Sequence, residues 1–201
     1  MAGVVIQAPI QLQDAQLDEV TSKLRKYLVD PVTRERIGRA RFLGGWEVWL
    51  QVDLVLFLQR EYPNHDITRE KKIFPNLHES VDVWAQPGPF APNAAGLPRF
   101  AIELKVEYDT AGRTLRSRLE QEITQLRNGA RVPQPAYSTP GTLFYCVGFT
   151  QMLDDCTKGW ENLSRQYPGL QMYWWKLPGM GVTADMGGAA NYYLVWYKHT
   201  F

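Results

Sequence analysis

The spacing of apolar side chains predicts two helices near the beginning of the chain. Residues 14–28 carry apolar residues three or four positions apart, the repeat of a helix with one buried face, at Leu17, Val20, Leu24 and Leu28. Asp30-Pro31 ends this helix, because proline disfavours helical backbone at the residue before it. Residues 46–62 form a longer apolar segment that stops at Pro63, so we expect a second, buried helix as the spine of the core.

The remaining segments predict a sheet with more helices. Six segments bounded by proline, glycine or asparagine are interpreted as strands, the first of them a charged edge strand: residues 67–74, 81–85, 100–106, 142–150, 170–177 and 191–198. Helical spacing of apolar residues predicts two further helices, at residues 114–128 and 155–167, the first of which has Gly129 at its C-terminal end. This succession predicts the α/β class, with a mixed central sheet flanked by helices on both faces.

The composition is typical of one globular domain. We expect a single domain over residues 1–201 with a core at about 45–177, because this length and 45% hydrophobic residues allow a sizeable core. The longest apolar run, residues 54–58, is too short to cross a bilayer, and the N-terminus lacks the basic start of a signal peptide. We therefore expect an intracellular protein with no membrane partner, in which Cys146 and Cys156 are reduced thiols.

Three charged residues interrupt the apolar pattern of two neighbouring strands. Asp82 lies in one strand, and Glu103 and Lys105 lie two residues apart in the next. Because successive side chains of a strand point to opposite faces, Glu103 and Lys105 share one face, and the other belongs to the apolar residues Ile102, Leu104 and Val106. Buried charges need a partner or a metal, and two carboxylates suit a hard cation such as magnesium. The pattern predicts a site for cutting phosphodiesters.

The same three residues also fit an ordinary surface. An acid followed about twenty residues later by Glu-x-Lys occurs by chance in many chains, and such a strand face is often a solvated cross-strand pair. The order of the elements favours the functional interpretation: the strand with Asp82, a loop, the strand with Glu103 and Lys105, an amphipathic helix and an apolar strand.

This arrangement resembles the PD-(D/E)XK nuclease superfamily, also called the restriction-endonuclease-like fold. The resemblance covers most of residues 45–150, including the helix with Glu47, the strand with Asp82 and the triplet Glu103-Leu104-Lys105. The chain departs from the signature at Val81, where the family commonly has a proline before the first acid. The resemblance implies a single nuclease-like domain that hydrolyses phosphodiester bonds, with DNA favoured over RNA as the substrate.

The resemblance also implies a role for each residue of the motif. It predicts a site for Mg²⁺, with Mn²⁺ as a substitute, formed by Asp82, Glu103, Glu47 and the backbone carbonyl of Leu104. Lys105 would position the nucleophile or help deprotonate it, and would stabilise the pentavalent state.

The choice of Glu47 has competitors on the same predicted helix. The family often places an acid on its first core helix, and Asp53 and Glu61 are alternatives to Glu47. Glu47 is favoured because it lies near the start of the helix, beside Gly44-Gly45.

Basic residues and one glutamine after the motif are candidates for nucleic-acid contacts. Arg113, Arg116 and Arg118 could neutralise phosphates, although basic faces of helices are also commonly solvated. Gln121 matches a glutamine that some branches of the family direct toward the metal, but the tyrosine usually found one turn later is replaced by Gln125. A solvent-facing glutamine is therefore the favoured interpretation.

Two other functions remain open at this stage. The chain could keep the nuclease fold without turnover and act as a binding or regulatory module, which the net charge of only +1 favours modestly because many nucleases are visibly basic. It could also be a generic α/β protein in which the three motif residues are surface charges. Endonuclease against exonuclease action, and assembly as a homodimer, also stay open.

Overall fold

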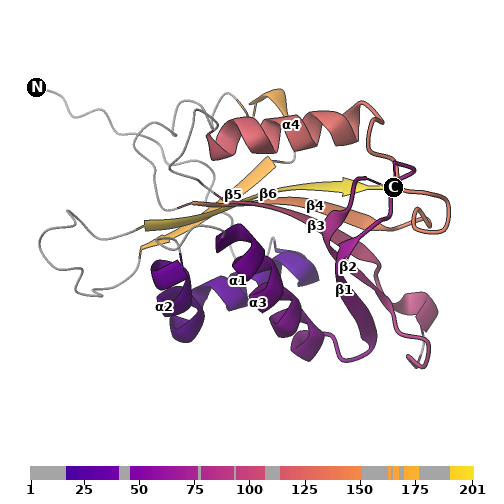
Figure 1. Cartoon of the computed structure of the whole chain (residues 1–201), viewed down its shortest axis with the longest axis horizontal. Helices are drawn as coiled ribbons and strands as arrows, with labels where there is room; N and C mark the ends of the chain where they lie inside the picture. The colour runs from indigo at the N-terminus through magenta and orange to yellow at the C-terminus, as the bar shows by residue number, and fades with distance from the viewer. Residues whose placement is uncertain are drawn as a thin grey trace, which may run out of the picture.

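The chain folds around one mixed sheet with helices on both of its faces (Figure 1). The computed structural model describes residues 17–40, 46–76, 78–92, 94–106, 114–150, 163, 165–167, 170–176 and 191–201. Over these residues the sheet has six strands in the order β1-β2-β3-β4-β6-β5. The predicted α/β class and the mixed central sheet are confirmed.

All six predicted strands form, with bounds that differ from the predicted ones by no more than a few residues. They are β1 (His65–Lys71), β2 (Val81–Pro87), β3 (Phe100–Val106), β4 (Leu143–Thr150), β5 (Leu170–Lys176) and β6 (Asn191–Thr200). Only β3 and β4 pair in parallel, and the other neighbours are antiparallel. The charged strand β1 lies at one edge of the sheet, as predicted.

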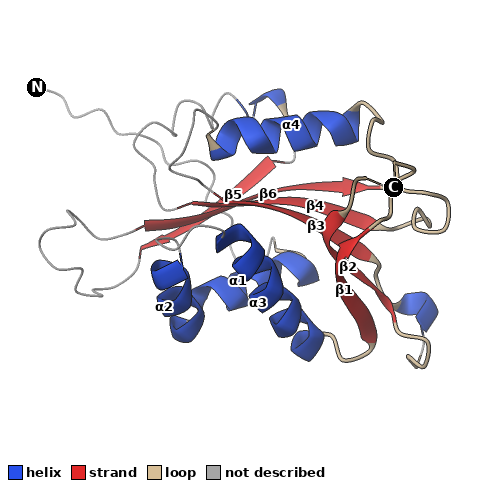
Figure 2. Ribbon diagram, in the orientation of Figure 1, coloured by secondary structure: helices blue, strands red, loops and turns tan. Residues whose placement is uncertain are grey.

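The helices divide between the two faces of the sheet. Helices α1 (Glu19–Val29), α2 (Pro31–Ala40) and α3 (Trp46–Glu61) lie together on one face, and α4 (Leu115–Arg127) lies on the other (Figure 2). A short 3-10 turn, η3 (Ala94–Gly96), lies in the proline-rich loop between β2 and β3. The helix predicted over residues 155–167 falls largely outside the described residues, among which Leu163, Arg165 and Gln166 are helical.

Helix α2 was not predicted, because Asp30-Pro31 was interpreted only as a stop. Pro31 instead occupies the first position of α2, where proline is favoured since its missing N–H needs no partner there. The Asp30 carboxylate accepts a hydrogen bond from the backbone N–H of Thr33 at 2.7 Å, as a residue at a helix N-terminus commonly does. The two residues therefore end α1 and begin α2.

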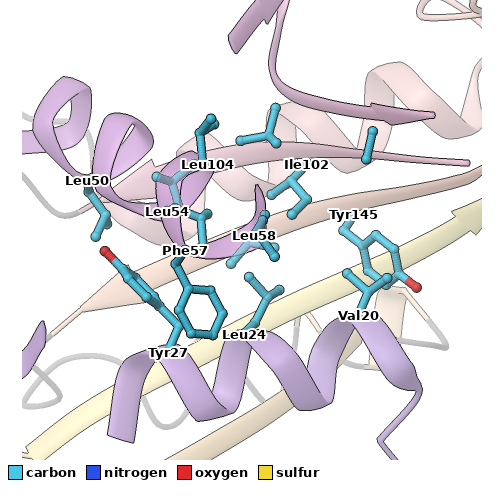
Figure 3. Packing of buried hydrophobic residues seen from close by; sticks show 14 of the residues in the cluster. Val20, Leu24, Tyr27, Leu50, Leu54, Phe57, Leu58, Ile102, Leu104 and Tyr145 are labelled. Atoms are coloured by element: carbon cyan, nitrogen blue, oxygen red, sulfur yellow. The ribbon is translucent and has the colours of Figure 1, made fainter. Parts of the chain in front are cut away.

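Two apolar cores lie on the two faces of the sheet. The larger one joins α1 and α3 to alternate residues of β3, and Figure 3 shows side chains such as Leu24, Leu54, Ile102 and Leu104 packed together in it. The second one joins α4 to the opposite face of the sheet and includes Leu119, Ile123 and Phe144. Because both faces are covered, the central strands read as continuous apolar runs.

A glycine in β4 lets α4 lie close to the sheet. A Cβ at Gly148 would overlap the side chain of Leu119 and would lie 3.3 Å from Cδ2 of Leu115. Both leucines are buried, so neither can swing into solvent to make room. Gly148 also pairs with Lys105 in the register of β3 and β4, so this contact helps to hold α4 over the charged end of β3.

We predict that Gly148→Ala destabilises the protein by about 1–3 kcal/mol, the usual cost of overfilling a packed core. Urea unfolding followed by circular dichroism measures this change. The control is Gly96→Ala, because a Cβ at Gly96 meets no atom within 4 Å. Leu119→Ala should cost less stability in the Gly148→Ala background than in the wild type, and strictly additive effects of the two changes would contradict the proposed overlap.

Candidate active site

Strands β2 and β3 part from each other where the sequence places its charged residues. Their last backbone pair is Val83 with Ile102, and Asp82 and Glu103 are the next residues on each strand. Beyond that pair, the Asp82 carboxylate accepts the backbone N–H of Leu104 through Oδ2 at 2.6 Å. A side chain thus replaces the next rung of the ladder, and a carboxylate is held between two strands.

The predicted alternation of β3 is confirmed. Ile102, Leu104 and Val106 lie in the core beneath α1 and α3. Lys105 lies on the other face, where its Nζ is 3.4 Å from Oε1 of Glu122 on α4. Glu103 shares that face and is also buried.

Four charged side chains close a ring beneath α4. We call the set of Glu103, Lys105, Glu122 and Arg131 the charge ring. Lys105 Nζ lies 2.5 Å from Glu103 Oε1 and 3.4 Å from Glu122 Oε1. Arg131 pairs with Glu122 and lies 3.6 Å from the same Oε1 of Glu103. Positive and negative charges alternate around the ring, so each carboxylate contacts two cations.

Two oxygen atoms beside this network are buried and have no hydrogen-bond donor. One is Oε2 of Glu103, whose partner oxygen belongs to the charge ring. The other is Oε1 of Gln51 on α3, whose amide nitrogen donates to Oδ1 of Asp82 at 2.7 Å. A buried oxygen that accepts no hydrogen bond is costly, so this end of the sheet can take up a cation or a donor.

Glu47 lies near the same end of β3, whereas its competitors do not. Its carboxylate accepts the backbone N–H of Val106 at 3.2 Å and pairs with Arg118 of α4 at 2.9 Å. Asp53 bonds to Tyr27 and Arg36, and Glu61 bonds to Lys23 and Lys26, all of them residues of α1 and α2. Of the three acids weighed on this helix, the structure brings only Glu47 to the end of β3.

The electrostatics of the site disfavour the charged forms of Asp82 and Glu103, mainly through burial. Burial and the neighbouring charge of Glu103 raise the pKa of Asp82 to about 7, although Lys105 partly opposes them. Burial also raises the pKa of Glu103, despite the nearby Lys105. Burial would lower the pKa of Lys105, but the charges of Glu103 and Glu122 outweigh it and raise this pKa. The lysine therefore stays charged.

The residues predicted to contact nucleic acid differ in their exposure to solvent. Arg113 lies outside the described residues. Arg116 is exposed on α4, and so is Gln121, in agreement with a solvent-facing glutamine. Arg118 is partly buried and holds both Glu47 and the backbone carbonyl of Val106, at 2.7 Å for the latter. Arg118 thus braces the site from α4.

Three residues of the site were not predicted as its members. Gln51 lies one helical turn after Glu47, so the spacing of four residues could have placed it on the same face of α3. Glu122 belongs to the buried side of α4, where an acid among apolar residues signals a buried partner. Arg131 comes after α4, and no sequence pattern indicates that it turns back to Glu103.

The donor set fits a divalent cation in part. Among the described residues, no group of three or more His, Cys, Asp or Glu side chains could hold a metal. Asp82 and Glu103 supply two carboxylates, and Oε2 of Glu103 accepts no hydrogen bond. The second undonated oxygen, Oε1 of Gln51, belongs to the amide that donates to Asp82. Hard cations such as Mg²⁺ prefer such oxygen ligands and are often bound through one or two carboxylates.

Comparisons with known proteins found no match to this chain, whether among the models of protein families, the curated proteins or the solved structures. Nor does any helix in the described part of the chain have the length and apolar character needed to cross a membrane. The resemblance to the PD-(D/E)XK superfamily thus stays a prediction from the sequence.

We predict that Asp82→Asn stabilises the metal-free protein at pH 8 by about 1 kcal/mol, because burial and the charge of Glu103 disfavour the charged form of Asp82. The unfolded chain releases this proton near pH 3.8 and the folded protein only near pH 7, so rising pH between these values lowers the stability of the wild type. Urea unfolding in EDTA between pH 4 and pH 8 measures the effect. The gain should vanish toward pH 4.

The control for this prediction is Asp66→Asn, because Asp66 is exposed on β1. This change should alter stability little at either pH. A gain from Asp82→Asn that is equal at pH 4 and pH 8, or a loss at pH 8, would show that the charge of Asp82 does not oppose folding.

Proposed function

We propose that this protein is a metal-dependent nuclease that hydrolyses phosphodiester bonds, with DNA as the favoured substrate. One observation carries the proposal: the carboxylates of Asp82 and Glu103 and the amine of Lys105 lie together where β2 and β3 part, and the acids are incompletely neutralised. Burying such a group of charges is costly for a protein that only needs to fold. A function that uses the charges accounts for their presence.

The resemblance to the PD-(D/E)XK superfamily supports a role for each residue. Asp82 and Glu103 would bind Mg²⁺, with the backbone carbonyl of Leu104 and the carboxylate of Glu47 as further ligands. A divalent cation in such a site activates water and neutralises charge on the phosphate. Because Glu47 is bonded to Arg118 and Val106, its part in this set would require the ion pair with Arg118 to loosen.

Lys105 would act through its charge. Its amine is buried among Glu103 and Glu122 and stays protonated, so it suits the stabilisation of a phosphate that gains negative charge better than the removal of a proton. In this role Lys105 would contact the phosphate instead of Glu103.

The charge ring supports a second candidate, a binding or regulatory module that keeps the fold without turnover. Each carboxylate of the ring already contacts two cations within the protein. A network closed in this way can serve fold specificity alone. The two candidates differ in whether Asp82, Glu103 and Lys105 are needed for cutting.

We predict that the wild type nicks supercoiled plasmid or degrades single-stranded DNA in Mg²⁺ or Mn²⁺, and that EDTA stops it. Lys105→Met should lower the rate about 100-fold or more, the usual effect of removing one electrostatic group from an active site. Asp82→Ala and Glu103→Ala should abolish cutting. Gel electrophoresis of timed reactions gives the rates, and circular dichroism checks the fold of each variant.

The control is Lys26→Met, because Lys26 is 62% exposed on α1 and pairs with Glu61 away from the site. It should cut at the wild-type rate. A wild type that binds DNA in a gel-shift assay and never cuts it with either cation would favour the binding module.

A further inference from the structure

Gln51 is a polar residue in an apolar place. It lies on α3 between residues of the main core, such as Leu50 and Leu54, and is only 5% exposed. Burial of an amide there costs free energy unless both of its ends have partners. The partners of this side chain therefore indicate why the position is polar.

Only one end of the Gln51 amide has a partner. The carboxylate of Asp82 accepts hydrogen bonds, so the end that contacts its Oδ1 at 2.7 Å is the amide nitrogen. The oxygen must then point elsewhere, and it is buried without a donor. If Gln51 only held Asp82 in place, this second end would be an uncompensated cost.

Glu103 repeats this feature. Its side chain is 5% exposed, its Oε1 belongs to the charge ring, and its Oε2 is buried without a donor. Two buried oxygens of this kind thus come from residues that act directly on Asp82, one by a hydrogen bond and one by its charge. Oxygens without donors are suited to a cation.

A third carboxylate is not part of this group. No three acidic, histidine or cysteine side chains gather at any point of the described structure in a way that could hold a metal. Glu47, the further acid of the proposed function, is bonded to Arg118 and Val106. An amide oxygen is an ordinary ligand of hard divalent cations and can fill the third place.

We propose that Gln51 is a member of the cation site, in which its amide nitrogen fixes Asp82 and its amide oxygen joins the carboxylates of Asp82 and Glu103 as a ligand. This inference rests on the cation site of the proposed function and adds a residue to it. Two acids and one amide, drawn from β2, β3 and α3, then form the centre of a site for a hard divalent cation. Glu47 would join them only if its ion pair with Arg118 loosened.

The test is binding of Mn²⁺ alone to the purified protein, measured by isothermal titration calorimetry without DNA. Gln51→Met keeps the size of the side chain and removes both ends of the amide, so we expect the dissociation constant for Mn²⁺ to rise about 10- to 100-fold. Gln51→Glu keeps an oxygen in the same place, so it should bind Mn²⁺ at least as tightly as the wild type.

The matched control is Gln59→Met, the same change on the same helix. Gln59 donates to the backbone carbonyl of Ile67 at 3.0 Å and has no contact with Asp82, so its loss should leave Mn²⁺ affinity unchanged. Thermal melting in EDTA reports the stability of every variant. If Gln51→Met does not fold, the Mn²⁺ affinities of Gln51→Glu and the wild type still test the role of the amide oxygen.

Each outcome separates this inference from the proposed function. Wild-type affinity in Gln51→Met, or an equal loss in Gln51→Met and Gln51→Glu, would overturn the role of the amide oxygen and leave the cation site of Asp82 and Glu103 standing. A wild type that binds no Mn²⁺ would overturn both. A loss in Gln51→Met that Gln51→Glu does not share supports the inference.

Discussion

Burial of charge at the point where β2 and β3 part is the constraint on which the rest of the structure depends. A carboxylate taken out of water is tolerated only with hydrogen bonds or opposite charges around it. Asp82 obtains them from the backbone of Leu104 and from Gln51, and Glu103 obtains them from Lys105 and Arg131. These partners come from β3, from α3 and from the segment after α4, so the packing of these elements is what makes the buried acids tolerable.

Helices from both faces of the sheet meet at this point. From one face α3 contributes Gln51 and Glu47, and from the other α4 contributes Glu122 and Arg118. Arg118 pairs with Glu47 and so joins the two helices across the end of β3. Gly148 permits the close packing of α4 on β4, and this packing holds Arg118 in position to reach Glu47.

Stability and function have opposite requirements here. The raised pKa values of Asp82 and Glu103 mean that the charged forms of both acids weaken the fold. Two buried oxygens without donors add to that cost. Natural proteins retain such features where a bound group offsets their cost in stability. This region is therefore a better candidate for a functional site than any solvated ion pair on the surface.

Much of the scaffold and part of the site could be predicted from the sequence. Helical spacing predicted α1 and α4, an apolar run that stops at Pro63 predicted α3, and segments between turn-forming residues predicted the six strands. The alternation of β3 placed Glu103 and Lys105 opposite Leu104, because a strand's faces follow directly from residue parity. Helix α2 was missed, since a proline can both end one helix and begin the next. The sequence favoured Glu47 over Asp53 and Glu61, and the structure brings Glu47 to β3. Only the tertiary structure decided that Gln51 holds Asp82 and that Arg131 returns to Glu103. These contacts join residues that are far apart in the chain. They are determined by how α3 and α4 pack on the sheet, and no local sequence pattern encodes that packing.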